Sequence, residues 1–173
     1  LGPLPRTLAL ADRVLGPLTG AAGFVLWLAL VGTAIALLPG QWAAFQANLA
    51  RFLSVQAALV LLAARMTAKV WHELHHAVVA RRYAVEVREA GLMFVLFAPI
   101  GAYVDVSGVW RLASRWQRLH ITAAGAMGEL ALAAIAFILW VRWPGAEAAP
   151  FLQALALTAS VSAVLININP LMR

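Results

Sequence analysis

The 173-residue chain contains no cysteine. This excludes a disulfide framework and a thiolate metal site, so any transition metal would have to be bound by histidine and carboxylate side chains. Charged residues are also scarce, at 12% of the chain against about 25% in soluble domains. Because 64% of the residues are hydrophobic and the mean hydropathy is +0.86, the composition predicts an integral membrane protein.

Acidic residues are the rarer charged class, with 7 Asp and Glu against 13 Lys and Arg, for a net charge of +6. We predict no nucleic-acid partner, because the basic residues do not form an aromatic-interleaved polar surface. The positive-inside rule explains the surplus better. With a cytoplasmic N-terminus, only Arg51 and Arg142 among the arginines between apolar runs lie outside. The sequence therefore predicts a protein of the bacterial inner membrane with both ends in the cytoplasm.

Long apolar runs divide what we interpret as a single domain, residues 1–173. We expect an all-α polytopic membrane protein with about four transmembrane helices, and a small membrane-face β-hairpin or sheet between the second and third. Alternating residues punctuated by Pro99 and Gly101 indicate the strands. The predicted segments are an interfacial lead-in at 1–20, helices at 21–39, 52–80, 121–141 and 151–167, a strand-like segment at 84–109 and an interfacial helix at 110–119.

The second predicted helix is unusual because its uncharged apolar part, residues 52–64, is too short to cross a bilayer alone. The helix must continue through a polar stripe formed by Arg65, Lys69, His72 and His76, which share one face at ~100° per residue. Charged side chains at membrane depth face protein or a water-filled cavity rather than lipid. The stripe is therefore the strongest candidate for a functional site.

Residues 72–76 of this stripe read His-Glu-Leu-His-His, an H-E-x-x-H motif. Residues i and i+4 share a helix face, so His72 and His76 can bind one zinc ion while Glu73 acts as general base. Zinc lowers the pKa of a bound water to ~7, and the hydroxide can attack a peptide carbonyl. The alternative is a helix with a few structural polar residues. Such groups cost several kcal/mol in a membrane helix, which favours the metal site.

Four other polar residues are candidates for supporting roles. His75 lies ~100° around the helix from His76, so we expect it to pack or form a hydrogen bond. Lys69 is expected to line a wet cavity or to pair with Glu129. A third metal ligand is needed, and Asp105 and Glu129 are the internal acids placed near membrane depth or at the membrane face. Either could be a ligand, and each could have another role.

Three ordered motifs together resemble the site-2 protease class of intramembrane zinc metalloproteases. They are the 72–76 motif, the Gly125-x-x-x-Glu129 pattern in a later helix, and the run Asn-Ile-Asn-Pro-Leu-Met-Arg at 167–173. With the Tyr-Val-Asp-Val segment at 103–106, the chain is most similar to a bacterial branch of peptide zinc metalloproteases. The resemblance covers roughly residues 55–173.

The resemblance implies that His72 and His76 bind Zn²⁺, that Glu73 is the base, and that Asn167 holds the substrate carbonyl or oxyanion. In this class the third ligand is an aspartate of an Asp-Gly pair, expected here two residues beyond Arg173. The resemblance thus implies a C-terminally truncated sequence with an incomplete site, and a further domain or subunit could follow Arg173. The sequence departs from the class at His75, commonly glycine, and at Ala126, proline in many relatives.

We therefore predict a membrane-embedded zinc metalloendopeptidase that hydrolyses peptide bonds of a membrane or peptide substrate in or near the bilayer. One alternative is a non-catalytic relative that acts as a peptide-binding export or assembly subunit. A second is a b-type haem protein with His76 and His120 as axial ligands. Haem would explain neither Glu73 nor the Asn-Pro sequence at 169–170.

Overall fold

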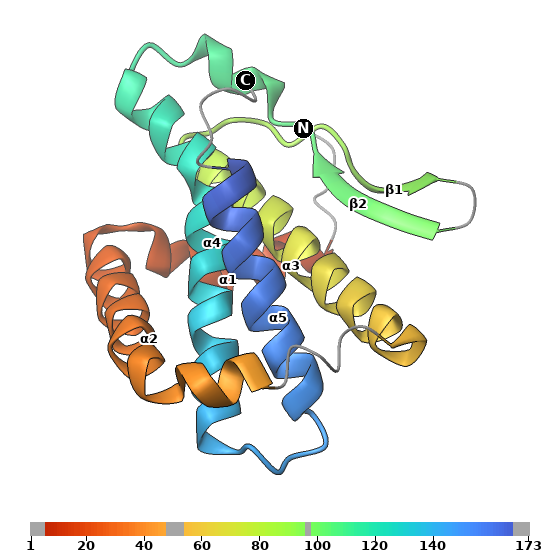
Figure 1. Ribbon diagram of the computed structural model, residues 1–173. Helices are drawn as coiled ribbons and strands as arrows, with labels where there is room; N and C mark the ends of the chain where they lie inside the picture. Colours follow the sequence, from red (N-terminus) through yellow and green to blue (C-terminus); the bar gives the residue numbers. More distant parts are fainter. Residues whose placement is uncertain (1–5, 48–53, 96–97, 168–173) are drawn as a thin grey trace.

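The computed structural model describes residues 6–47, 54–95 and 98–167, and this part of the chain is mostly helical (Figure 1). The α-helices are α1 (Arg6–Leu15), α2 (Ala21–Ala47), α3 (Val55–Arg82), α4 (Arg115–Arg142) and α5 (Ala149–Val161). Strands β1 (Ala90–Val95) and β2 (Ala98–Val104) form one sheet. Short 3₁₀ helices η1 (Gly16–Thr19) and η3 (Ser107–Arg111) and the π-helical segment η4 (Ser162–Asn167) complete the fold. The predicted combination of a helical protein with a small sheet is thus observed.

Helices α3, α4 and α5 form the core of the molecule (Figure 1). Small residues dominate their contacts, and Ala64, Ala136 and Ala154 are at most 1% exposed. Small side chains allow helix backbones to approach closely, which is how helices associate in a bilayer. At the far end of α4, Phe137 and Trp140 pack against Phe45 of α2, with ring centroids 6.0 and 5.5 Å away.

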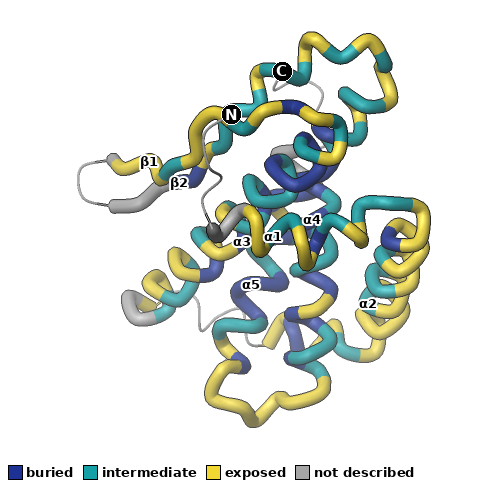
Figure 2. Tube along the Cα trace, turned by 180° about the vertical axis from the view of Figure 1, so that it is seen from behind, coloured by how far each residue is buried: buried dark blue, intermediate teal, exposed yellow. Residues whose placement is uncertain are grey.

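Helix α2 is attached to this core much more loosely. Of the most apolar 18-residue stretch of α2 only 6% is buried, whereas 56% of the corresponding stretch of α4 is buried. Figure 2 shows exposed residues along most of α2. The hydrogen bonds that hold α2 include those from Trp27 Nε1 to the Met127 carbonyl and from Gln153 Nε2 to the Phe45 carbonyl, both of 2.8 Å. An exposed apolar surface of this extent suits contact with lipid.

Two helices among the described residues, α2 and α4, are long and apolar enough to cross a membrane. Helix α3 is also continuous over 28 residues, a length of ~42 Å at 1.5 Å per residue. Its apolar first half and its polar stripe therefore belong to one helix, as the sequence predicted. The last apolar helix, from Ala149 to Val164, is shorter.

Two of the predicted helix divisions are wrong. The predicted 21–39 helix does not end at Pro39 but continues as α2 to Ala47. A proline breaks one backbone hydrogen bond, yet a membrane helix tolerates it, and Phe45 beyond it gains core packing. The predicted interfacial helix at 110–119 and the span at 121–141 are not separate, because α4 is unbroken from Arg115. No glycine or proline lies between residues 115 and 124 to interrupt it.

The other predicted segments differ mainly at their ends. The 1–20 lead-in contains helix α1, and the 52–80 helix extends to Arg82, with residues 52 and 53 outside the described part. The 151–167 helix begins at Ala149 and becomes π-helical from Ser162. Its predicted break at 167–170 lies almost wholly beyond the described residues.

The predicted hairpin within residues 84–109 is present. Strands β1 and β2 are antiparallel, with Ala90 opposite Val104 and a register irregularity at Met93 and Phe94. Gly91 lies under the ring of Tyr103, where a Cβ atom would come within 2.8 Å of that ring. Figure 1 shows the hairpin projecting beside α3, and β2 is the strand that contacts this helix. The fold thereby brings the hairpin to the polar stripe.

Candidate metal centre

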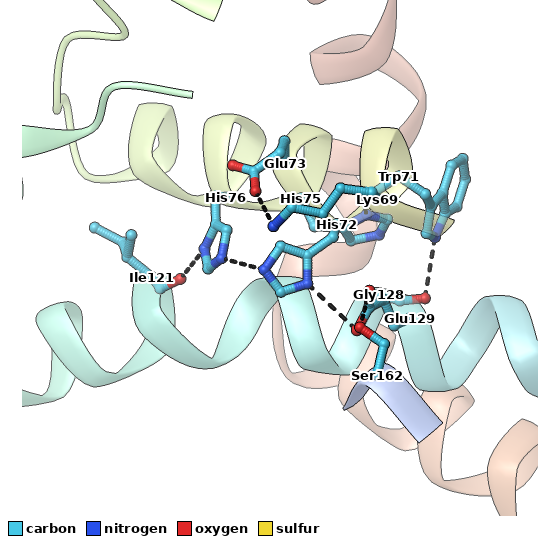
Figure 3. A network of polar contacts seen from close by, with 10 residues as sticks. All are labelled: Lys69, Trp71, His72, Glu73, His75, His76, Ile121, Gly128, Glu129 and Ser162. Atoms are coloured by element: carbon cyan, nitrogen blue, oxygen red, sulfur yellow. Dashed lines mark hydrogen bonds and ion pairs between the residues drawn. The ribbon is translucent and has the colours of Figure 1, made fainter. Parts of the chain in front are cut away.

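His72 and His76 lie one turn apart on α3 and direct their rings toward α4 (Figure 3). Their Nε2 atoms are 2.9 Å apart. Two zinc–nitrogen bonds of ~2.0–2.1 Å at a tetrahedral angle would place ligand nitrogens roughly 3.3 Å apart. A small opening of the pair would therefore let both nitrogens bind one ion.

The outer nitrogens of the two rings have defined neighbours. His76 Nδ1 is 2.7 Å from the carbonyl oxygen of Ile121. A carbonyl oxygen only accepts, so Nδ1 carries the proton and Nε2 keeps its lone pair for a metal. His72 Nδ1 lies 3.4 Å from Glu129 Oε2, yet this buried atom makes no aligned hydrogen bond within the described residues. The contact is thus an electrostatic one that a small rotation of the ring would align.

Glu129 is almost fully buried in α4, at 1% exposure. Besides its contact with His72, its Oε1 accepts a hydrogen bond of 3.0 Å from Ser162 Oγ in η4. Carboxylates behind metal-binding histidines fix the ring orientation and raise its basicity. In this geometry Glu129 lies behind His72, on the far side from His76 (Figure 3).

Two glycines of α4 make room for the imidazoles of α3. A Cβ atom on Gly125 would collide with the rings of both His72 and His76, and one on Gly128 would collide with the ring of His75. The Gly125-x-x-Gly128 spacing therefore lets α4 approach the polar stripe closely. A Cβ atom on Gly125 would come within 2.5 Å of both Nε2 atoms, so glycine at this position keeps the Nε2 edges of the two imidazoles free of a side chain.

Glu73 lies beside the pair and contacts the hairpin. Its Oε1 is 2.6 Å from Lys69 Nζ and its Oε2 accepts a 3.1 Å hydrogen bond from the Val104 backbone N–H in β2. Of the two roles predicted for Lys69, lining a wet cavity or pairing with Glu129, the second is not observed, because Lys69 pairs with Glu73. Lys69 and Glu73 are i and i+4 neighbours on one helix, whereas Glu129 is engaged on the other side of His72.

His75 is separate from the His72–His76 pair. Its Nδ1 is 2.9 Å from the Trp71 carbonyl oxygen, and its ring packs 4.8 Å from the Trp71 ring, centroid to centroid. It also lies against Gly128 rather than Gly125. The imidazole is therefore placed for packing and hydrogen bonding.

Asp105 lies in the connection after β2, away from the imidazole pair. Its Oδ1 accepts a 2.8 Å hydrogen bond from the Ser107 backbone N–H. This bond, together with the Ser107 side chain, holds the pKa of Asp105 below its ordinary value. The carboxylate thus serves a local turn in this structure.

Within the described part of the chain, no three His, Asp or Glu side chains are close enough to hold a metal ion together. The residues present fit two nitrogen ligands of such an ion. Asn167 ends the π-helical segment η4, but its side chain is outside the described part, so its predicted role stays a prediction. π-Helical turns are frequent at functional sites.

Comparison with known proteins adds a family assignment to this geometry. A family model described as peptidase family M50 matches residues 56–172, from α3 past the end of η4. The uncharacterized protein MJ0971 of Methanocaldococcus jannaschii is 30% identical over 59 residues. The match covers 34% of this chain and 16% of that relative, so the chain spans about a sixth of its length. No solved structure matches the chain.

Proposed function

Because the chain belongs to peptidase family M50, the site-2 protease family of membrane metalloproteases, we propose that it is a zinc-dependent endopeptidase cutting peptide bonds in or near the bilayer. The observation that carries this proposal is the His72–His76 pair, with Nε2 atoms 2.9 Å apart and Glu73 beside it. The narrower assignment to a bacterial peptide zinc metalloprotease branch remains a prediction from the sequence motifs.

His72 and His76 would hold the zinc ion through Nε2. Zinc at such a site supplies Lewis acidity, which brings the pKa of water to ~7. Ile121 and Glu129 orient the two rings from behind, and Gly125 leaves the space in front of them. The protein thus directs two imidazole Nε2 atoms toward one point, and both could bind an ion once the proton shared between them is lost.

Glu73 would accept the proton of the attacking water and deliver it to the leaving amine. Both of its oxygens are held, one by Lys69 and one by the Val104 N–H. These contacts fix the carboxylate beside the imidazole pair at the base of the hairpin. A peptide lying along β2 would therefore pass close to the general base.

We also propose that α2, α3, α4 and α5 with η4 are four spans of a bacterial inner-membrane protein with both ends in the cytoplasm. The continuous 28-residue length of α3 supports this, because a span needs ~20 residues. The proposed partners are a membrane or peptide substrate, the bilayer, and a further domain or subunit after Arg173.

The two alternative functions are less well supported. A non-catalytic peptide-binding subunit would not need a carboxylate positioned beside a converging imidazole pair. In a haem protein, His76 and His120 would be axial ligands, yet each has another partner here. His76 Nε2 faces His72, and His120 Nδ1 is 2.8 Å from the Tyr83 hydroxyl.

Replacing Glu73 with glutamine tests the proposal in the full-length protein. We expect Glu73→Gln to keep its zinc but to lose about 10²–10⁴-fold of its peptide cleavage rate, because a general base is removed. Zinc content and cleavage of an unfolded fluorogenic peptide would be measured in detergent. The matched control is Glu86→Gln, at an exposed acid with no contact to the site. Equal cleavage by Glu73→Gln and the parent would rule out the assigned base.

A further inference from the structure

A cavity of about 730 Å³ lies between α2 and the α3–α4 pair, with η1 at one end. Three of its lining residues are tryptophans: Trp27, Trp71 and Trp116. His75 and Gly128 also line it, whereas His72, Glu73 and His76 do not. The cavity is therefore distinct from the candidate metal centre and shares only the neighbouring turns of α3 and α4 with it.

The cavity is polar at one end and apolar along the rest of its length. The polar end holds two bonded pairs: Arg82 Nη1 donates to Thr19 Oγ1 at 3.0 Å, and the Tyr83 hydroxyl is 2.8 Å from His120 Nδ1. Farther along α4 and α2 the lining is apolar, with Leu30 and Ile135. This is the polarity pattern of an amphiphile with one small polar head.

The cavity is long enough to cover an acyl chain through one leaflet of a bilayer. From His120 at the polar end to Ile135, α4 advances ~22 Å at 1.5 Å per residue. One leaflet contributes ~15 Å to a hydrocarbon core of ~30 Å. An acyl chain lying between α2 and α4 would therefore be covered along its whole length, with its headgroup at the level of Arg82.

The charge at the polar end selects for an anion. Arg81 is paired with Asp12, with Nη2 and Oδ2 3.2 Å apart. The neighbouring Arg82 has a hydroxyl partner, Thr19, but no carboxylate within ion-pair distance among the described residues. Basic pockets between transmembrane helices bind anionic lipid headgroups. Arg82 thus supplies an uncompensated positive charge at the mouth of an apolar cavity.

We propose that this cavity binds one anionic phospholipid, with its phosphate at Arg82 and an acyl chain between α2 and α4. The lipid would contribute to the packing of α2, which is otherwise tied to α4 chiefly by the Trp27–Met127 hydrogen bond and the aromatic contacts of Phe45. This inference concerns a site apart from the metal centre and does not depend on catalysis.

The tryptophans of the cavity provide the test. Delipidated full-length protein in detergent is titrated with phosphatidylglycerol or phosphatidylcholine that carries bromine on its acyl chains, and quenching of tryptophan fluorescence is measured. We expect saturable quenching at lower concentrations of the anionic lipid. Arg82→Gln should weaken phosphatidylglycerol binding by about fivefold, the usual effect of one basic residue on an anionic lipid, and leave phosphatidylcholine unchanged.

Three further variants test separately the hydroxyl partner of Arg82, an arginine outside the cavity, and the apolar part of the cavity. Thr19→Ala keeps the charge of Arg82 and removes only its hydroxyl partner, so the preference for phosphatidylglycerol should remain. Arg111→Gln, at an exposed arginine outside the cavity lining, should change nothing. Ala131→Phe fills the apolar part and should abolish saturable quenching by both lipids, with helix content and melting temperature confirming that it folds.

Several results would overturn the proposal. One is equal affinity for the two lipids in both the parent and Arg82→Gln, and another is the absence of saturable quenching. Displacement of bound phosphatidylglycerol by a transmembrane peptide, but not by excess unbrominated lipid, would instead identify the cavity as a peptide site.

Discussion

His75 and His76 are adjacent in the sequence, yet they serve different regions of the molecule. Each imidazole lies against a glycine of α4, His76 at Gly125 and His75 at Gly128. His76 Nε2 lies next to His72 Nε2, whereas His75 is hydrogen-bonded to the Trp71 carbonyl and lines the cavity beside α2. Residue type therefore does not decide the role of each histidine. That role is decided by the direction in which the side chain leaves α3 and by its neighbour on α4.

The same comparison extends to the two sides of the helical core. On the side of His76, α3, α4 and η4 enclose a polar chain from Ile121 through the half-buried His76 to the buried His72 and Glu129. On the side of His75, α2 stands off and leaves a cavity. A buried network requires every polar group to be placed accurately, so we expect substitutions on the His76 side to affect metal binding and those on the His75 side to affect packing.

The largest effect on zinc affinity is expected at Gly125. Gly125→Ala would put a Cβ atom into both metal-binding imidazoles, so we expect zinc affinity to fall by more than the roughly 10–100-fold typical of losing an outer partner. Chelator competition on the full-length protein would measure it. Gly128→Ala is the matched control, because the atoms nearest to its Cβ atom belong to His75 rather than to His72 or His76. It should keep zinc and lose about 1–3 kcal/mol of stability through overpacking. Equal zinc loss in both variants would contradict the comparison.

A smaller effect is expected from the buried carboxylate behind His72. Glu129→Gln keeps the shape but removes the negative charge 3.4 Å from His72 Nδ1. We expect zinc affinity to fall by about 10–100-fold, measured again by chelator competition. Ser162→Ala, which removes only the hydroxyl that donates to Glu129, should have a weaker effect. An unchanged affinity in Glu129→Gln would show that this carboxylate has no role in metal binding.

Much of the centre was predictable from residue spacing. The i, i+4 rule places His72 and His76 together on any helix, and the shortage of apolar residues before Arg65 indicated that α3 continues through them. The hairpin followed from alternation and turn residues, and it is present within residues 84–109. These features depend on local pattern alone, which a sequence displays directly.

Contacts between segments far apart in the sequence were harder to predict. The hydrogen bonds to Glu73 and from His76 involve the backbone of Val104 and Ile121, and every residue has such a backbone group, so no side-chain pattern indicates them. The sequence marks Glu129 as an acid in an apolar run but leaves its partner open, because only the packing of α3 on α4 decides between Lys69 and His72. The helix boundaries failed at Pro39 for a similar reason, because core packing of Phe45 outweighs a local helix breaker.

The smallest effect on metal binding should come from His75→Ala. This variant tests whether His75 is separate from the metal centre. The variant removes an imidazole that packs on Trp71 and Gly128 but leaves His72, Glu73 and His76 in place. We expect unchanged zinc affinity and a loss of about 2 kcal/mol of stability, since a partly buried ring is replaced by a small side chain. Chelator competition and thermal unfolding would be measured on the same samples. The counterpart His76→Ala should lose its zinc, because one of the two ligand nitrogens is removed. If His75→Ala instead released zinc, the two adjacent histidines would belong to one site, and the division of α3 into a metal-binding side and a packing side would be wrong.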